Sequence, residues 1–209
     1  MAGLALALLA VYVALAFGAR TALQLRHTGS TGFKGVSGRP GSAEWAGGVL
    51  FVFALGLGLA APVLDLAGAV DPVGFLDGRV GHALGFVLYA LGLAGTLVGQ
   101  GSMGRSWRIG VDRAEKTDLV TTGPFAAVRN PIFSAMIPAF LGLALMVPNV
   151  CALAGVLALV AAVELQVRCV EEPYLTRVHA ERYLDYASKV GRFAPGVGTL
   201  RPRGGGGRR

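Results

Sequence analysis

Two short polar stretches carry the residue types that can hold a charged small molecule. The first is Leu-Val-Thr-Thr-Gly-Pro-Phe at 119–125, followed by Arg-Asn-Pro at 129–131, and the second is Arg-Cys-Val-Glu-Glu at 168–172. Residues 132–167 between them are almost entirely apolar. If they fold as a helical hairpin, Arg129 and the two glutamates return to the same side of a membrane. Charged groups at a membrane are costly unless they bind a partner, so this juxtaposition predicts a small-molecule site.

The second stretch continues a helical pattern of charge. Glu164, Arg168 and Glu171 or Glu172 are spaced i, i+4 and i+7 or i+8, which predicts one shared helix face. A glutamate at the membrane centre costs roughly 2.5–3.5 kcal/mol, so Glu164 should pair with Arg168 one turn on. The alternative is a purely structural ion pair. For Arg129 the matching alternative is an anchor at the lipid headgroups.

The elements that must position these stretches are membrane helices. The 209 residues are 54% hydrophobic and only 15% charged, against roughly 25% charged in soluble domains. A helix needs about 20 residues to cross a bilayer. The sequence predicts an all-α integral membrane protein with about five transmembrane helices, in which helices four and five form a hairpin and the segment after Pro173 forms an interfacial amphipathic helix. The expected spans are 1–25, 45–66, 80–100, 132–147 (a marginal one) and 150–167.

Loop charges predict the orientation. Basic residues follow the first and third spans and fill the segment after residue 167, whereas the loop after the second span carries Asp65, Asp71 and Asp77. By the positive-inside rule the N-terminus lies outside and both polar stretches are cytoplasmic. The first span lacks a basic leading region, which favours a retained helix over a signal peptide. The net charge of +7 then reflects topology and lipid headgroups, not nucleic-acid binding. The composition suggests a bacterial inner membrane.

The chain divides into three parts by composition. We expect residues 1–79 to hold the two N-terminal helices, 80–196 a functional membrane core, and 197–209 a disordered basic tail with four consecutive glycines. The segment 27–41 is rich in Gly, Ser and Thr and indicates a tether more than a lid. Two Gly-x-x-x-Gly pairs, at 81–85 and 95–99, predict close helix packing, within the monomer or between copies. No metal site is expected from two cysteines and three scattered histidines.

The motifs together resemble the isoprenylcysteine carboxyl methyltransferase family, whose bacterial members and related phospholipid N-methyltransferases share a core. The resemblance covers roughly residues 80–196. The motifs that carry it are Leu119-Val-Thr-Thr-Gly-Pro-Phe-x-x-x-Arg-Asn-Pro-Ile-Phe, Arg168-x-x-Glu-Glu-x-x-Leu175, and Tyr183-x-x-Tyr186-x-x-x-Val190-x-Arg192-Phe193-x-Pro195.

This resemblance implies an integral membrane methyltransferase that binds S-adenosylmethionine at its cytoplasmic side, under the C-terminal helix. Carboxylates would take the cofactor's ammonium or ribose hydroxyls and an arginine its carboxylate. The family commonly has His at position 130 and Tyr at 133, so Asn130 is expected to bind and not to titrate. The residues that the resemblance assigns to the cofactor are Gly123, Arg129, Asn130, Pro131, Glu171 and Glu172, with Gln100 and Gly101 from the Gly-Gln-Gly turn of the phospholipid branch.

The methyl acceptor is expected to be a lipophilic small molecule or lipid that enters from the bilayer. No convincing general base stands out, which slightly favours a carboxylate acceptor, since an amine must first lose a proton. Arg168 or Arg192 would then act as the catalytic residue that steers the carboxylate. Two alternatives remain. One is an NADPH-dependent membrane reductase similar to the sterol reductases, which would need Arg105, Arg108 and Arg113 for the phosphates; the other is a non-catalytic scaffold.

Overall fold

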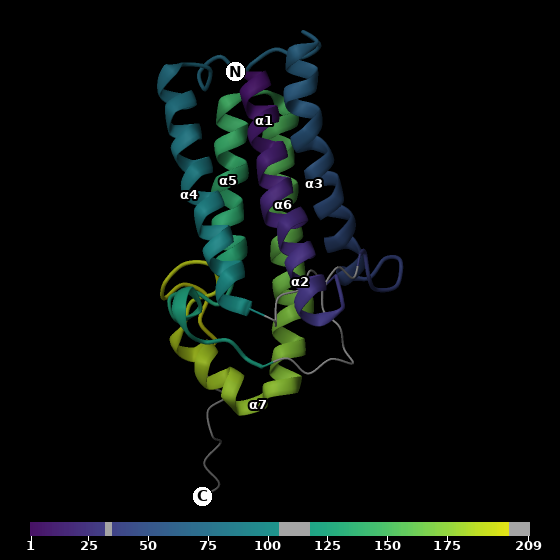
Figure 1. The fold of residues 1–209 in the computed structure, drawn as a ribbon, viewed down its shortest axis with the longest axis vertical. Helices are drawn as coiled ribbons and strands as arrows, with labels where there is room; N and C mark the ends of the chain where they lie inside the picture. Colours follow the sequence, from purple (N-terminus) through teal and green to yellow (C-terminus); the bar gives the residue numbers. More distant parts are fainter. Residues whose placement is uncertain (32–34, 105–117, 201–209) are drawn as a thin grey trace, which may run out of the picture.

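Long apolar helices run side by side through most of the molecule, and shorter polar elements cover one end (Figure 1). The computed structural model describes residues 1–31, 35–104 and 118–200. Within these residues the fold is all-helical. The elements are α1 (Ala2–Tyr12), η1 (Val13–Ala19), α2 (Arg20–Thr28), α3 (Ala43–Leu66), α4 (Arg79–Met103), η3 (Gly123–Ala126), α5 (Pro131–Met146), α6 (Val150–Leu165), η4 (Gln166–Glu171) and α7 (Glu172–Lys189).

Four helices of the described part are long and apolar enough to cross a membrane. They are Ala2–Thr28, Ala43–Leu66, Arg79–Met103 and Val150–Lys189. The predicted fourth span is a shorter apolar helix, Pro131–Met146, of 16 residues, and its inner residues are buried by its neighbours. The prediction of an all-α integral membrane fold is confirmed, and the marginal span is the one that falls below the length of a full crossing.

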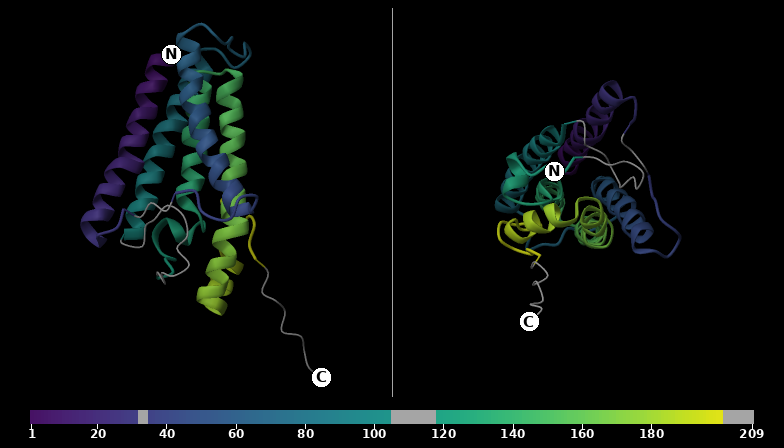
Figure 2. Two further views of the ribbon diagram at one scale, coloured as in Figure 1. Left: turned by 90° about the vertical axis from the view of Figure 1, so that its right-hand side faces the viewer. Right: turned by 90° about the horizontal axis from the view of Figure 1, so that it is seen from below.

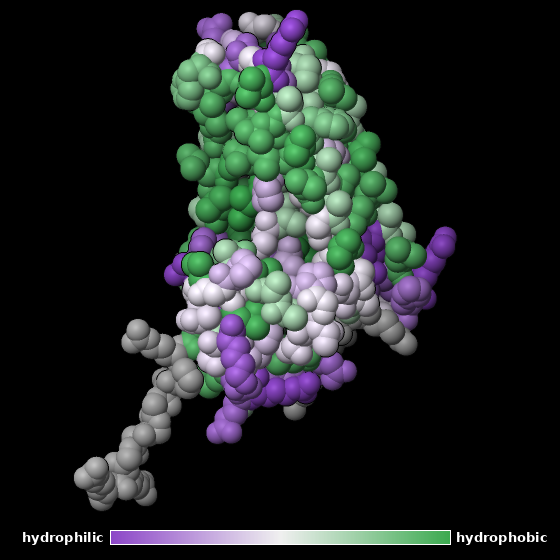
Figure 3. Space-filling model, turned by 90° about the vertical axis from the view of Figure 1, so that its left-hand side faces the viewer, coloured by the Kyte–Doolittle hydropathy of each residue, from purple (hydrophilic) through white to green (hydrophobic). Residues whose placement is uncertain are grey.

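The hydropathy of the surface changes along the length of the helix bundle. A hydrophobic surface covers the upper part of the face shown in Figure 3 below a hydrophilic tip, whereas the lower part is mixed and ends in hydrophilic residues. Seen from below, α7 runs across the end of the bundle (Figure 2). This helix is interrupted at Ala180, whose φ of 45° and ψ of −123° are not helical. The predicted amphipathic helix therefore exists as two short halves that cover the polar end.

Glycines bring α4 and α5 into backbone contact. A Cβ added at Gly92 would lie 2.5 Å from the amide nitrogen of Ala139, and one added at Gly85 would lie 2.6 Å from the carbonyl oxygen of Gly142. Small residues permit this approach because nothing else fits between two helix backbones. A Cβ added at Gly95 or Gly99 would lie 2.9 Å from a side-chain carbon of α5, of Ala135 and Ile132 respectively. The glycines at 85, 95 and 99 thus pack within the monomer.

The first helix contributes the centre of the core. Tyr12 is fully buried, its hydroxyl shares a 3.0 Å hydrogen bond with the hydroxyl of Thr96, and its ring lies edge-on to Phe140. A buried tyrosine hydroxyl needs such a partner. The residues before Tyr12 that face the bundle are small or aliphatic, such as Ala5 and Leu9. The N-terminal segment therefore packs as an integral helix of the bundle.

Asn149 joins α5 to α6 and ties both to α3. Its side chain is fully buried, accepts a hydrogen bond from the amide of Ala152 and donates one of 3.0 Å to the carbonyl of Ala61. Replacing it with alanine is expected to lower the free energy of unfolding by about 2–3 kcal/mol, since a cap is lost and a buried carbonyl loses its donor. Thermal unfolding in detergent measures the loss. Asn149→Ser, which keeps a capping oxygen but is too short to reach Ala61, should recover about half of it.

Candidate functional site

A cavity of about 280 Å³ lies between the ends of the long helices and α7. One part of its wall is apolar and comes from the membrane helices, with Phe17, Phe51 and Met136. The other part is polar and comes from the predicted stretches, with Arg129 and Glu171. A pocket with both characters suits a molecule that has an apolar and a charged portion.

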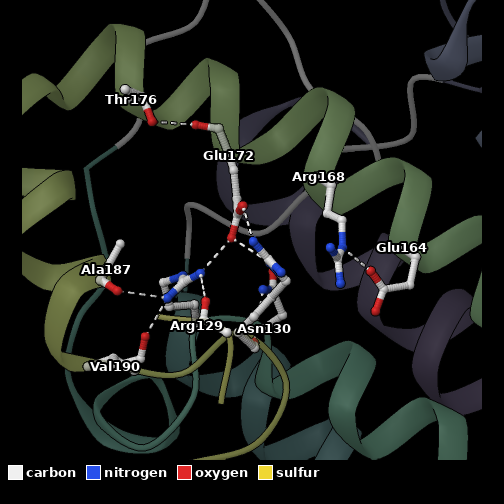
Figure 4. Close-up of polar contacts among 10 residues, drawn as sticks. Arg129, Asn130, Glu164, Arg168, Glu172, Thr176, Ala187 and Val190 are labelled. Carbon is white, nitrogen blue, oxygen red and sulfur yellow. Dashed lines mark hydrogen bonds and ion pairs between the residues drawn. The ribbon is translucent and has the colours of Figure 1, made fainter. Parts of the chain in front are cut away.

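Glu172 lies at the centre of the polar contacts, at the start of α7 (Figure 4). Arg192 donates to both of its oxygens, from Nε to Oε1 and from Nη2 to Oε2, at 2.8 Å each. Arg129 donates from Nη2 to Oε1 at 2.6 Å. All three side chains are largely buried, with Arg129 only 2% exposed. Such charge-assisted, bidentate pairs are the strongest class of protein hydrogen bonds.

Arg129 also holds backbone carbonyls at the end of the described chain. It donates from Nη1 to the carbonyls of Ala187, at 3.0 Å, and Val190, and from Nη2 to that of Gly198, at 3.0 Å. Figure 4 shows its guanidinium between Glu172 and the carbonyls of Ala187 and Val190. The arginine that sequence assigned to a cofactor carboxylate is therefore occupied by groups of the protein itself.

Segment 190–193 runs beside residues 128–130. The amides of Arg129 and Asn130 donate to the carbonyls of Gly191, at 2.8 Å, and Arg192, at 3.1 Å. The Asn130 side chain donates to the Arg192 carbonyl as well, at 3.1 Å. Asn130 precedes Pro131 at the start of α5, and its side chain makes no capping bond. The backbone amides of residues 129 and 130 are therefore occupied by this segment.

The predicted pair of Glu164 and Arg168 is present, but Glu172 does not share its helix face. Arg168 pairs with Glu164, and both side chains are substantially exposed, at 56% and 36%, whereas Glu172 is buried. The reason is η4, a π-helical segment over Gln166–Glu171. Hydrogen bonds from i to i+5 add a residue to the turn and so rotate Glu172 inward. Figure 4 shows the Glu164–Arg168 pair to one side of Glu172.

Electrostatics reinforce the central cluster. The hydrogen bond with the Glu172 carboxylate raises the pKa of Arg192 above its ordinary value, although burial alone would lower it. Arg192 therefore remains a cation, and Glu172 is shared between two guanidinium groups.

Six of the ten predicted site residues line the cavity. Gly101 and Gly123 are exposed, and they, Arg168 and Arg192 do not line the cavity. Gln100 does line it and is buried; its Nε2 donates to the carbonyl of Ala16 at 2.8 Å. The predicted residues that line the cavity are Gln100, Arg129, Asn130, Pro131, Glu171 and Glu172.

Sequence reasoning missed one wall of the cavity. Residues 35–37, placed in a tether, line it, and so does the start of α3 with Glu44 and Gly48. Val36 rests against Gly48, where an added Cβ would lie 3.0 Å away, and the Ser37 hydroxyl donates to Glu44 at 2.7 Å. The sequence feature that marks this segment is the start of a helix, because Ser42 caps α3 and an acidic residue stands in its first turn.

The lining is acidic. Among the lining residues that the structure describes, four carboxylates stand against Arg129 as the one arginine. Arg192 neutralises part of this charge through Glu172 from outside the cavity. An excess of carboxylates favours a cationic occupant over an anionic one. The carboxylates are Glu44, Asp118, Glu171 and Glu172.

Residues 197–200, which the sequence assigned to a disordered tail, make hydrogen bonds to the rest of the fold. The amide of Leu200 donates to the carbonyl of Ala187 at 2.9 Å, and Val197 and Gly198 bond to Arg192 and Arg129. Residues 201–209 lie outside the described part, and so do Arg105, Arg108 and Arg113 of the reductase alternative.

Comparison with known families agrees with the motifs. Residues 80–182 match the family model described as phospholipid methyltransferase. This segment includes α4, α5, α6, η4 and the first half of α7, and hence both predicted polar stretches. The match ends before Arg192 and begins after the wall formed by residues 35–52. No curated protein matches the chain.

Proposed function

Residues 80–182 of this chain belong to the phospholipid methyltransferase family, and from that premise we propose that the protein methylates a lipid or lipophilic molecule with S-adenosylmethionine as the methyl donor. The family supports a membrane methyltransferase that acts on lipid. We propose further that the protein lies in a bacterial inner membrane with its site on the cytoplasmic side, as the loop charges predict.

The observation that carries the proposal is the acidic, half-apolar cavity at the polar end of the bundle. S-adenosylmethionine has a sulfonium and an ammonium group against one carboxylate, so its net charge matches the lining. When bound, it supplies an electrophilic methyl group. A nucleotide such as NADPH, which is a polyanion, fits this lining poorly, and that disfavours the reductase alternative.

The chain's own residues would hold the cofactor by charge and by shape. Glu171, half-buried on the cavity wall, is placed to accept from the ammonium or the ribose hydroxyls. Asn130, Pro131 and Gln100 line the same cavity and would orient the cofactor. Transfer of a methyl group depends mainly on aligning the nucleophile with it, which buried, hydrogen-bonded side chains do well.

The acceptor would reach the cavity through the apolar wall. Val52 of α3 lines the cavity and is 58% exposed on the apolar surface of the bundle, so a lipid chain could extend there. The excess of carboxylates disfavours the carboxylate acceptor that the lack of a base suggested. We therefore propose an uncharged or amine-bearing acceptor. An amine would lose a proton before transfer.

The test is methyl transfer by detergent-purified protein. Isotope-labelled S-adenosylmethionine is incubated with lipid extract, and label in the organic phase is the expected result. Calorimetry with S-adenosylmethionine, and separately with NADPH, identifies the cofactor. Binding of NADPH in place of S-adenosylmethionine would support the alternative of a membrane reductase. If the folded protein binds neither molecule, the alternative of a non-catalytic scaffold remains.

A further inference from the structure

We propose that Ala180 is the hinge of a lid over the cavity. The lid is the second half of α7, residues 181–189, which closes the polar end of the cavity and moves away to admit a molecule from solution. The hinge is a property of the protein alone, whereas the identity of the admitted molecule, S-adenosylmethionine, rests on the proposed function.

The backbone at Ala180 has a conformation that side chains disfavour. Its φ of 45° and ψ of −123° are not helical, and no other non-glycine residue of the described part has a positive φ. A positive φ brings Cβ too close to a carbonyl oxygen, so such positions usually hold glycine. The side chain of Ala180 is exposed, so packing of its methyl group does not account for the conformation. The bend in α7 (Figure 1) is therefore strained.

Both halves of α7 line the cavity, one on each side of the bend. Tyr174 and Leu175 line it from the first half, and Tyr183 and Tyr186 line it from the second. The first half continues α6 and η4 without a break, so it is fixed to the bundle. The second half is the part whose position over the cavity depends on the bend.

Polar contacts hold the lid against the opposite wall. The hydroxyl of Tyr186 donates to the carbonyl of Phe125 in η3 at 2.5 Å. Arg129 donates from Nη1 to the carbonyl of Ala187 at 3.0 Å. These contacts place the lid against η3 and the segment before α5, off the axis of the first half. Ala180 takes up the change of direction, so the strain at the hinge accompanies the closed lid.

Opening the lid relieves this strain. Once the two contacts break, Ala180 can return to helical angles, and alanine has the highest helix propensity of all residues. A glycine at position 180 has the opposite effects, because it adopts a positive φ without a steric penalty and disfavours a helix. Alanine at the bend therefore populates the open form more than glycine does, and this population controls access to the cavity.

The first experiment measures lid opening without a ligand. Ala187, which is fully buried on the lid, is replaced by cysteine in protein whose native cysteines are changed to serine, and its reaction with a water-soluble maleimide is timed. Ala180→Gly should slow the labelling about tenfold or more, which corresponds to about 1.4 kcal/mol or more. Ala180→Val should speed it, because a β-branched side chain disfavours a positive φ further. Labelling that is unchanged or faster in Ala180→Gly would overturn the hinge.

Three further variants separate lid opening from other effects. Glu181→Gly places a glycine at the exposed neighbouring position, which is helical, and should not slow the labelling because no strain is relieved there. Tyr186→Phe removes the bond to Phe125 and should speed labelling about two- to tenfold, the effect of one hydrogen bond. Ala54→Cys, buried within α3, should stay unlabelled on the same timescale beside each change, which shows that the bundle remains folded.

The second experiment asks whether the lid admits the methyl donor. The association and dissociation rates of S-adenosylmethionine are measured in wild type and Ala180→Gly. We expect both rates to fall about tenfold while the dissociation constant stays within about twofold, because glycine favours the closed form equally with and without the ligand. A residue that only shaped the binding site would change the dissociation constant.

The outcomes distinguish the hinge from the proposed function. If the folded protein binds no S-adenosylmethionine but Ala180→Gly still slows labelling of the lid, the proposed function fails and the hinge stands. If labelling slows while both rates of S-adenosylmethionine binding are unchanged, the ligand enters by another path and the lid does not control access to the cavity.

Discussion

Replacing Glu171 with glutamine is expected to weaken the binding of S-adenosylmethionine about 10- to 150-fold. This is the effect of losing a hydrogen bond to a charged group, worth about 1.5–3 kcal/mol. Thermal stability should change little, because Glu171 is half-buried and a glutamine oxygen can still accept from Gln166. Isothermal calorimetry in detergent gives the affinity, and a thermal melt of the same sample gives the stability.

Glu181→Gln is the matched control for this prediction. Glu181 is an exposed glutamate on the second half of α7 and does not line the cavity, so the same change of charge there should leave the affinity within about twofold. Equal losses in the two variants would mean that overall charge governs binding. Unaltered affinity in Glu171→Gln would remove Glu171 from the site.

Gly92→Ala is expected to destabilise the bundle strongly. The added Cβ would lie 2.5–2.7 Å from three backbone atoms of α5, belonging to Ala135 and Ala139. Backbone atoms cannot rotate away as a side chain does, so α4 and α5 must separate. We expect a loss of about 3 kcal/mol, at the upper end of the cost of overpacking, in the free energy of unfolding.

The control for Gly92→Ala is Gly56→Ala in α3. No heavy atom outside the local helix lies within 4 Å of a Cβ at Gly56, and alanine has the higher helix propensity, so stability should be unchanged or slightly raised. Denaturant titration in mixed micelles measures both variants. A Gly92→Ala protein as stable as wild type would contradict the close approach of α4 and α5.

The lengths of the apolar runs in the sequence were enough to predict most of the long helices. The five expected spans match observed helices to within about three residues, except where the sixth helix continues through η4 into α7. The hairpin was readable because Pro148 and Asn149 interrupt an otherwise apolar run. The glycine pairs predicted close helix packing but did not indicate which helix would pack there, because a glycine does not specify its neighbour.

The sequence predicted which residues form the candidate site better than it predicted their contacts. Motif order brought Arg129 and Glu172 together correctly, since the hairpin returns both to one end. Their partners were not foreseeable. Arg129 donates to the backbone carbonyls of Ala187, Val190 and Gly198. Because every residue has a backbone carbonyl, the sequence does not indicate which carbonyls an arginine will bind. The π-helical turn before Glu172 was equally hidden, because helix patterns assume a constant i+4 register.

The cavity wall made by residues 35–52 lies outside the segment that matches the family, whereas the polar residues of the opposite wall lie inside it. The two walls are separated in the chain by the whole of α4, so a mutation in one leaves the other's sequence intact. Variants in residues 35–52 therefore test the contribution of one wall of the cavity without altering the segment that matches the family.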